Sequence, residues 1–224
     1  MTTPQQPARP CSLSECLSAE YEQAHAVRQA RVLSELRRVV ERVPATREFT
    51  NCRRYQRYGS LFALVAACLL GWGIHVGSSG LFVCAALMTA GFAVMTWQHR
   101  NAGTQPFMRL TRSQLAVDSL SAPIDLLDVI GIEVKDEGFI MQQQLILRAD
   151  ANLPSHRATL QLFGNQAMAL QKPRPHIRIL STGLMYEGRK LQCDDVYVLL
   201  EAHCQAAQAQ QELDRLLRQG SGAS

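Results

Sequence analysis

The sequence has no Asp, Glu, Lys or Arg between Arg57 and Arg100. Because 19% of the chain is charged, an even spread would place about eight charged side chains among these 42 residues. Averaged over the whole chain, the values are those of a soluble protein, with 47% hydrophobic residues and a mean hydropathy of -0.07. The charge gap therefore excludes a single uniform globular body, and it also excludes a disordered chain or a small disulfide-rich secreted one.

The uncharged segment is long enough for two helices that cross a bilayer. A hydrocarbon core about 30 Å thick requires roughly 20 apolar residues of helix, and the segment holds roughly twice that number. The sequence Gly-Ser-Ser-Gly at 77–80 divides it, and each half is apolar on all sides, which suits a helix surrounded by lipid. We predict a transmembrane hairpin over 57–100, with helices at about 58–77 and 80–98. The alternative, a buried hairpin of a soluble protein, fits so long a charge-free segment poorly.

Arginines stand on both sides of the predicted hairpin, whereas its turn carries no charge. Positively charged flanks stay in the cytoplasm, so both termini should be cytoplasmic and only the turn should face outward. With 20 Arg against 3 Lys, a GC-rich bacterial source fits, and we expect a multi-pass protein of the inner (cytoplasmic) membrane. The residues expected to set the topology and to meet lipid headgroups are Arg47, Arg53, Arg54, Arg57 and Arg100.

Small residues recur on one face of each predicted helix: Ala63, Ala67 and Gly71 in the first, Ala86 and Ala90 in the second. Such faces let helix backbones approach closely in lipid. We expect them to pack within the hairpin, and a seam between two copies in a homo-oligomer is the alternative. No charged residue lies inside either helix, so an ion-transport pathway would have no ionisable group to use.

The region before the hairpin is rich in arginine. Residues 1–11 are rich in Pro and Gln and are expected to be a disordered tail. Residues 12–56 form an Arg-rich juxtamembrane region, with a helix predicted over 12–43 that begins with a capping box and ends before Pro44. Residues 1–57 contain ten Arg and six Glu, whereas residues 98–224 are neutral. This excess positive charge is the topology signal, and it could also attach the region to anionic lipid headgroups.

After residue 104 the hydrophobic period changes from that of a helix to that of a strand. Turn-rich pieces separate short alternating runs, and the last segment has an apolar helical stripe with Asp194 or Asp195 as its cap. The predicted strands are 107–110, 114–117, 127–134, 140–148, 158–163, 176–180 and 184–186. This order predicts an α+β cytoplasmic domain over 104–219, a seven-stranded barrel or sandwich closed by a C-terminal helix, and a short tail at 220–224.

Three stretches carry a resemblance to a known family: PFMRLTRSQLAV at 106–117, APIDLLDVIGIEV at 122–134 and HIRILSTGLMYEGRKLQCDDVYVLL at 176–200. With the preceding hairpin, they resemble bacterial two-span membrane proteins that carry a pleckstrin-homology-like (PH-like) cytoplasmic domain. The resemblance covers about residues 58–218 and rests on hydrophobic patterns. It implies binding or scaffolding beside the membrane. Phosphoinositide binding is not implied, because Arg109 and Arg112 are isolated and Asp118 follows them.

The sequence offers no motif for catalysis, a metal or a cofactor. It contains no G-x-S-x-G elbow, Walker loop, dinucleotide fingerprint or H-E-x-x-H. Its seven cysteines form no CxxC pair, and those on the cytoplasmic side should be reduced. Cys193, His203 and Cys204 form the only local group of metal-ligand types, and a packed helix face explains Cys204 better. We therefore expect neither an enzyme nor a bound cofactor or metal.

These features predict a non-enzymatic scaffold or adaptor that tethers a protein-binding module at the cytoplasmic face and so raises the local concentration of its partner. The alternatives are an immunity-type or secretion-system accessory membrane protein that binds one effector, and a membrane enzyme without a recognisable motif. We expect membrane lipids and one protein as partners, and no nucleic acid, because no nucleic-acid-binding fold accompanies the arginines. The partner should bind an exposed strand edge or the groove beside the predicted helix at 196–207. The helix residues predicted to contact it are Val196, Leu199, Leu200, Leu213 and Leu216.

Overall fold

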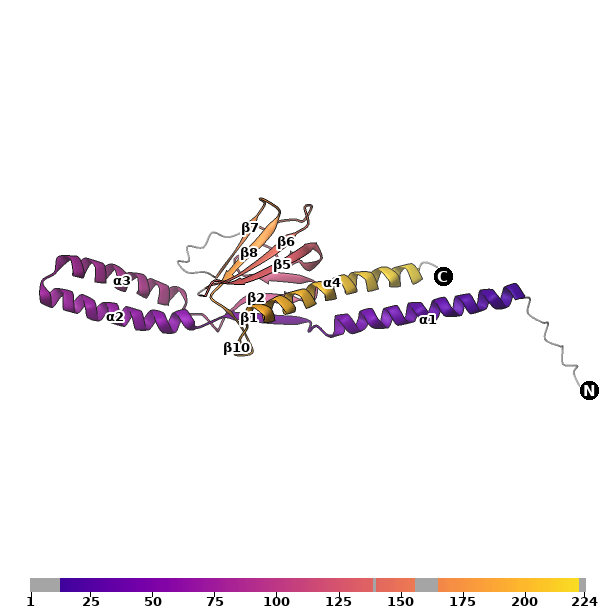
Figure 1. The fold of residues 1–224 in the computed structure, drawn as a ribbon, viewed down its shortest axis with the longest axis horizontal. Coiled ribbons are helices and arrows are strands. Elements are labelled where there is room, and N and C mark those ends of the chain that lie inside the picture. Colours follow the sequence, from indigo (N-terminus) through magenta and orange to yellow (C-terminus); the bar gives the residue numbers. More distant parts are fainter. Residues whose placement is uncertain (1–12, 139, 156–164, 222–224) are drawn as a thin grey trace, which may run out of the picture. The chain divides into compact units, whose positions relative to one another are not determined.

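The computed structural model describes residues 13–138, 140–155 and 165–221. In these residues the chain forms α-helices and two antiparallel sheets, so the predicted α+β class is confirmed (Figure 1). The chain divides into two compact units. One consists of the two ends, Met1–Arg42 and Ala209–Ser224, and the other is Val43–Gln208.

The unit made by the two ends contains α1 (Leu13–Glu41) and the last turns of α4 (Cys193–Ser221). α1 corresponds to the helix predicted over 12–43. Most of its described side chains are exposed, including Val27 at 65%. The ion pair between Arg31 and Glu35, at 3.2 Å, links successive turns on its surface.

The unit Val43–Gln208 is built on two sheets. The first has the strand order β10-β9-β1-β2-β3-β4, and the second has the order β5-β6-β8-β7. The strands are β1 (Thr46–Asn51), β2 (Pro106–Thr111), β3 (Gln114–Val117), β4 (Ile124–Asp125), β5 (Val129–Asp136), β6 (Met141–Leu147), β7 (Gln166–Leu170), β8 (His176–Ser181), β9 (Leu184–Tyr186) and β10 (Arg189–Lys190).

Most predicted strands are confirmed. Of the predicted seven-stranded barrel or sandwich closed by a C-terminal helix, the described residues show the strands and the helix that packs on them, but no closed barrel. Within the described residues, the strands form two open sheets. The strand predicted over 127–134 begins later, because Leu126–Asp128 forms a short 3-10 helix whose cap Asp125 accepts a 3.0 Å hydrogen bond from Leu127 N. The strand predicted at 158–163 lies outside the described residues. Strands β1, β4, β7 and β10 were not predicted.

One hydrophobic core joins the two sheets to the first turns of α4. Strand alternation places every second side chain inside, as in β6, where positions 141, 143, 145 and 147 are all buried. Leu145, Ile177, Ile179 and Leu200 are fully buried in this core. Each such side chain stabilises the fold by about 1.5–3 kcal/mol relative to an exposed one. Packing against α4, rather than closure of a barrel, therefore holds the sheets together.

Strand β1 belongs to this β-domain although it precedes the apolar segment. It pairs antiparallel with β2, in a register that places Phe49 opposite Met108 and Glu48 opposite Arg109. Phe49 is fully buried, and Glu48 Oε1 accepts a 2.8 Å hydrogen bond from Arg109 Nε. The domain therefore begins near residue 43 and not at 104. The predicted juxtamembrane region 12–56 is corrected accordingly, because its last part is a core strand.

The apolar segment forms the predicted hairpin of α2 (Arg54–Val76) and α3 (Ser79–Gln98), inserted between β1 and β2. Its turn is shorter than the predicted 77–80. Gly77 ends α2 in the left-handed conformation, with φ at +71°, which glycine adopts without steric cost. Ser78 then caps α3, since its side chain accepts a 3.4 Å hydrogen bond from Leu81 N.

Two of the described helices are long and apolar enough to cross a membrane. They are Gln56–Val76 and Ser79–Gln98, each with a mean hydropathy of 1.8 in its most apolar window. Only 17% and 11% of those windows are buried within the protein, whereas the core helix of a soluble protein is mostly buried. This low burial disfavours the alternative of a buried soluble hairpin.

The two helices touch along a line of small residues on α2. Gly59, Ala66 and Gly73 are buried and lie seven residues apart, which is the spacing of a seam between nearly antiparallel, gently supercoiled helices. A Cβ on Gly73 would stand 3.1 Å from Phe82 N, and a Cβ on Gly59 would stand 2.6 Å from Thr96 Oγ1. These glycines therefore permit the close approach of α3.

The small-residue face predicted for the hairpin is only partly the observed one. Ala67, Gly71 and Ala90 are exposed, while Ala63 and Ala86 are half-buried. The predicted residues follow the i, i+4 row, which turns away from a nearly antiparallel neighbour, whereas residues at i, i+7 stay in contact with it. Ala67 and Gly71 are consequently exposed on the surface of the hairpin and do not pack against α3.

Gly73→Val should destabilise the hairpin, whereas Gly71→Val should not. Both changes add the same side chain to α2, but a Cβ on Gly71 meets nothing within 4 Å while one on Gly73 approaches the backbone of α3. Overpacking of this kind costs about 1–3 kcal/mol. Thermal unfolding of the purified full chain measures the difference, with a lower midpoint expected only for Gly73→Val. Equal midpoints for the two variants would contradict the observed seam.

Candidate functional site

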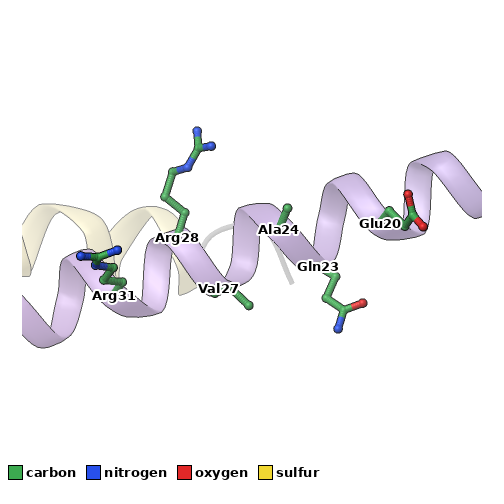
Figure 2. Close-up of a pocket in the computed structure, with 6 residues that line it drawn as sticks. All are labelled: Glu20, Gln23, Ala24, Val27, Arg28 and Arg31. Atoms are coloured by element: carbon green, nitrogen blue, oxygen red, sulfur yellow. The ribbon is translucent and has the colours of Figure 1, made fainter.

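Two shallow hollows of the end unit each lie on a single helix. One is on α4 at 211–219. The other, shown in Figure 2, is lined by Glu20, Gln23, Ala24, Val27, Arg28 and Arg31 of α1. In Figure 2, Arg28 and Gln23 point to opposite sides of the helix, so these side chains do not converge on one point. Neither hollow has a second wall, and neither forms a site.

The predicted group of metal-ligand types is not assembled. Among the described residues, no three His, Cys, Asp or Glu side chains are placed to hold a metal ion. Cys193 begins α4, while His203 and Cys204 follow almost three helical turns later, about 15 Å along the helix axis.

A groove lies between strand β5 and helix α4, both within the unit Val43–Gln208. It is lined by Val129, Ile130, Gly131 and Ile132 of β5 and by Tyr197, Glu201, Cys204, Gln205 and Gln208 of α4. β5 ends the strand order of its sheet, so its outer edge has no partner strand in the described part of the chain. An open edge presents unpaired backbone N–H and C=O groups, which another strand can pair with.

The strand wall of the groove is irregular at Ile130. Val129 pairs with Leu147 and Gly131 with Ile146, so Ile130 is an extra residue without a partner on β6. Its side chain is 60% exposed, and Tyr197 on the opposite wall is 40% exposed. Together they give the groove apolar surface on both sides.

The second half of β5 has a different character. Glu133 and Lys135 are exposed and form an ion pair at 3.2 Å. Charged side chains on an edge strand discourage pairing with another strand. The edge of β5 is therefore apolar at 129–132, where Ile130 is exposed and Val129 is buried, and charged at 133–136.

Two of the predicted partner contacts on α4 are core residues. Val196 and Leu200 are 1% and 0% exposed, and Leu199 packs partly buried against the same core. In the end unit, Leu213 is buried and Leu216 is half-buried. The apolar stripe that identified these residues faces the helix's own neighbours, so they do not form an open binding surface.

The groove uses the next row of α4, which the sequence analysis missed. Tyr197, Glu201, Gln205 and Gln208 follow one another at intervals of four, four and three residues, so they share one helix face. Only Tyr197 in this row is apolar, so the row has no hydrophobic periodicity by which it could be recognised. The isolated exposed aromatic residue beside the core stripe was the available signal.

The two thiols of α4, Cys193 and Cys204, are not activated. Burial raises the pKa of Cys204 to about 11, and the negative charge of Glu201 acts in the same direction. The pKa of Cys193 is also raised, first by burial and then by the carboxylate of Asp136. Because the thiolate is the nucleophile and the metal ligand, both groups stay unreactive near neutral pH. The lining of the groove at Cys204 is therefore uncharged near neutral pH.

Arg47, predicted to lie at the lipid interface, is part of the β-domain. It lies on β1, with its Cζ 5.2 Å from the centroid of the Tyr186 ring. Its Nε is buried and has no hydrogen-bond partner in the described residues. The four other predicted arginines lie at the start of α2 (Arg53, Arg54 and Arg57) and just after α3 (Arg100).

His203 is a buried titratable group on the core side of α4. It is 1% exposed, and its Nδ1 donates a 2.7 Å hydrogen bond to Leu199 O, which leaves Nε2 without a proton in the neutral ring. Burial lowers the pKa of His203 from its usual 6.5. The hydrogen bond to Leu199 opposes this shift, while the positive charge of Arg47 adds to it.

Comparison with known proteins finds no relative. No family model matches the chain, and neither a curated protein nor a solved structure is similar to it.

The buried neutral His203 should make the fold less stable in acid. Its folded pKa is lower than the unfolded value near 6.5, so the unfolded chain binds the proton more readily. Stability should therefore fall as the pH drops below about 6.5, by about 1.4 kcal/mol for each unit by which the pKa is lowered. Denaturant unfolding of the full chain at pH 7.5 and pH 5 measures this loss.

The matched variants are His203→Gln and, on the exposed surface of α1, His25→Gln. His203→Gln should reduce the difference between the two pH values, and His25→Gln should leave it unchanged. An undiminished difference in His203→Gln would contradict the assignment to His203.

Proposed function

We propose that this chain is a membrane-anchored, non-enzymatic adaptor whose β5–α4 groove binds an extended segment of a protein partner. The observation that carries the proposal is the groove itself, where the open apolar edge at 129–132 faces the exposed ring of Tyr197. Strand edges beside a helix are suited to an added peptide strand, because main-chain hydrogen bonds give affinity and side-chain pockets give specificity.

The groove also limits what the partner can be. The charged side chains of Glu133 and Lys135 discourage strand pairing along the second half of β5. Only about four or five partner residues can therefore pair along the first half. The partner segment should place apolar side chains against Ile130 and Tyr197. Polar groups flanking that segment can hydrogen-bond to Gln205 and Gln208 on the opposite wall.

The hairpin would hold this module at the cytoplasmic face of the inner membrane, with both termini inside. Two apolar helices with arginines at both ends and an uncharged turn support this topology. Only Cys52 and Arg53 separate β1 from α2, so the domain is attached closely. Confinement at the membrane raises the effective concentration of any partner that shares it.

A random-peptide selection against the full chain in nanodiscs tests the groove. Selected peptides should have alternating apolar residues, and Ile130→Glu should weaken their binding at least about tenfold, because a charge would enter an apolar contact. Val198→Glu is the matched control. Val198 lies on α4, next to Tyr197, and its exposed fraction of 62% matches that of Ile130, but it does not line the groove. Equal binding to wild type and Ile130→Glu, or equal losses in both variants, would contradict the proposal.

Thiol labelling of intact cells tests the topology. Cys68 and Cys84 are exposed on the hairpin surface, so only lipid would protect them from a charged, impermeant maleimide. We expect no labelling of either thiol in membranes, and fast labelling of an added Ser79→Cys at the turn. An added Gln208→Cys on α4 should be labelled only after lysis. Labelling of Cys68 and Cys84 in intact membranes at the rate of a surface thiol would contradict the spanning hairpin.

A further inference from the structure

Two arginine–aromatic pairs lie at the end of the hairpin opposite its turn, one at the start of α2 and one at the end of α3. The Cζ of Arg54 lies 5.8 Å from the ring centroid of Tyr58 on α2, and the Cζ of Arg100 lies 4.9 Å from that of Trp97 on α3. Both rings are exposed, Tyr58 at 51% and Trp97 at 64%. Aromatic side chains of this kind are enriched where a span meets the headgroup layer.

The two arginine–aromatic pairs lie at the same position along the axis of the hairpin. Gly59 on α2 lies opposite Thr96 on α3, because a Cβ on Gly59 would stand 2.6 Å from Thr96 Oγ1. Near the end of the hairpin, Arg53 Nε donates a 3.2 Å hydrogen bond to Ala102 O. The two exposed rings lie between these positions, one on each helix. Arg53, Arg54 and Arg57 fall within about one turn of α2, so together with Arg100 they form one band, which we call the arginine belt.

Two arginines of the belt donate hydrogen bonds to backbone carbonyl groups. Arg53 is held by Ala102 O and packs on Gly103, where a Cβ would stand 2.6 Å from its Nε. Arg54 Nη1 donates a 3.3 Å hydrogen bond to Gly138 O in the β5–β6 turn. Such contacts orient the guanidinium groups without neutralising them.

The positive charge of the belt is poorly compensated within the protein. Arg53, Arg57 and Arg100 form no ion pair with any described residue, and the first turn of α2 contains no acidic side chain. Arg57 and Arg100 are exposed. The like charges of Arg53, Arg57 and Arg100, which no described carboxylate pairs with, favour a bound anion.

We infer that the arginine belt binds the phosphates of anionic phospholipids. A guanidinium group offers a planar fork of donors that matches phosphate oxygens. The uncharged spans begin at the next residues, so a lipid phosphate would lie beside the belt while its acyl chains run along α2 and α3. The inference rests on the proposed membrane insertion but not on the groove, and the thiol labelling above tests insertion separately.

Native mass spectrometry of the full chain from mixed nanodiscs tests this binding. In discs of phosphatidylcholine and phosphatidylglycerol, the wild type should retain phosphatidylglycerol above its bulk share. Each arginine removed should weaken the association about fivefold, as expected for a basic residue near an anionic surface. Arg57→Gln with Arg100→Gln should therefore largely abolish the enrichment. Arg57→Gln alone, which removes an exposed side chain, should reduce it in the same direction if the double variant is unstable.

The matched control removes the same charge elsewhere. Arg28→Gln with Arg37→Gln, both exposed on α1, should keep the enrichment. Excess inorganic phosphate should not displace the lipid, because a headgroup is also held by its acyl chains. Equal enrichment in the belt variant and the wild type, equal loss in the control, or displacement by inorganic phosphate would each overturn the inference.

Discussion

The pairing of β1 with β2 is the constraint on which the rest of the structure depends. The two strands lie on either side of the apolar hairpin in sequence, yet they pair in register and place Phe49 opposite Met108. Because Phe49 is fully buried, β1 cannot detach from the core without a large loss of folding free energy. The hairpin thus leaves and re-enters the same sheet, and it is part of the domain's architecture rather than an anchor appended before it.

This arrangement gives the proposed function a physical basis. A domain attached at one point can rotate freely, whereas two short connections from neighbouring strands restrict how it can turn against the hairpin. Arg53 and Arg54 strengthen the attachment, because they donate hydrogen bonds to Ala102 O, before β2, and to Gly138 O, in the β5–β6 turn. A groove held this way would present its open edge in a limited range of orientations, which lowers the entropic cost of capturing a partner at the membrane.

Sequence patterns were informative for segments in which one environment, lipid-like surroundings or the protein core, determines the spacing of the apolar residues. The charge gap located α2 and α3, and strict alternation located β2, β6 and β8. β1 was missed because TREFTN holds one large apolar residue, and its partner strand lies beyond the whole hairpin. The seam was misplaced because both the i, i+4 and the i, i+7 rows of α2 contain small residues, and only the crossing of the helices selects Gly59, Ala66 and Gly73. The groove residues Glu201 and Gln205 were missed because a polar wall has no hydrophobic signature.

A designed crosslink between β1 and β2 tests the central claim, that an apolar helical hairpin interrupts a single β-domain. The variant carries Glu48→Cys and Arg109→Cys, a directly opposed and exposed pair, with the seven native cysteines replaced and a protease site between Gly77 and Ser78. Opposed residues in antiparallel strands lie within disulfide range. After oxidation and cleavage, the two fragments should migrate as one species until reductant is added, whereas Glu48→Cys with Lys135→Cys on the other sheet should give separate fragments. Separate fragments from the β1–β2 pair without reductant would contradict the account.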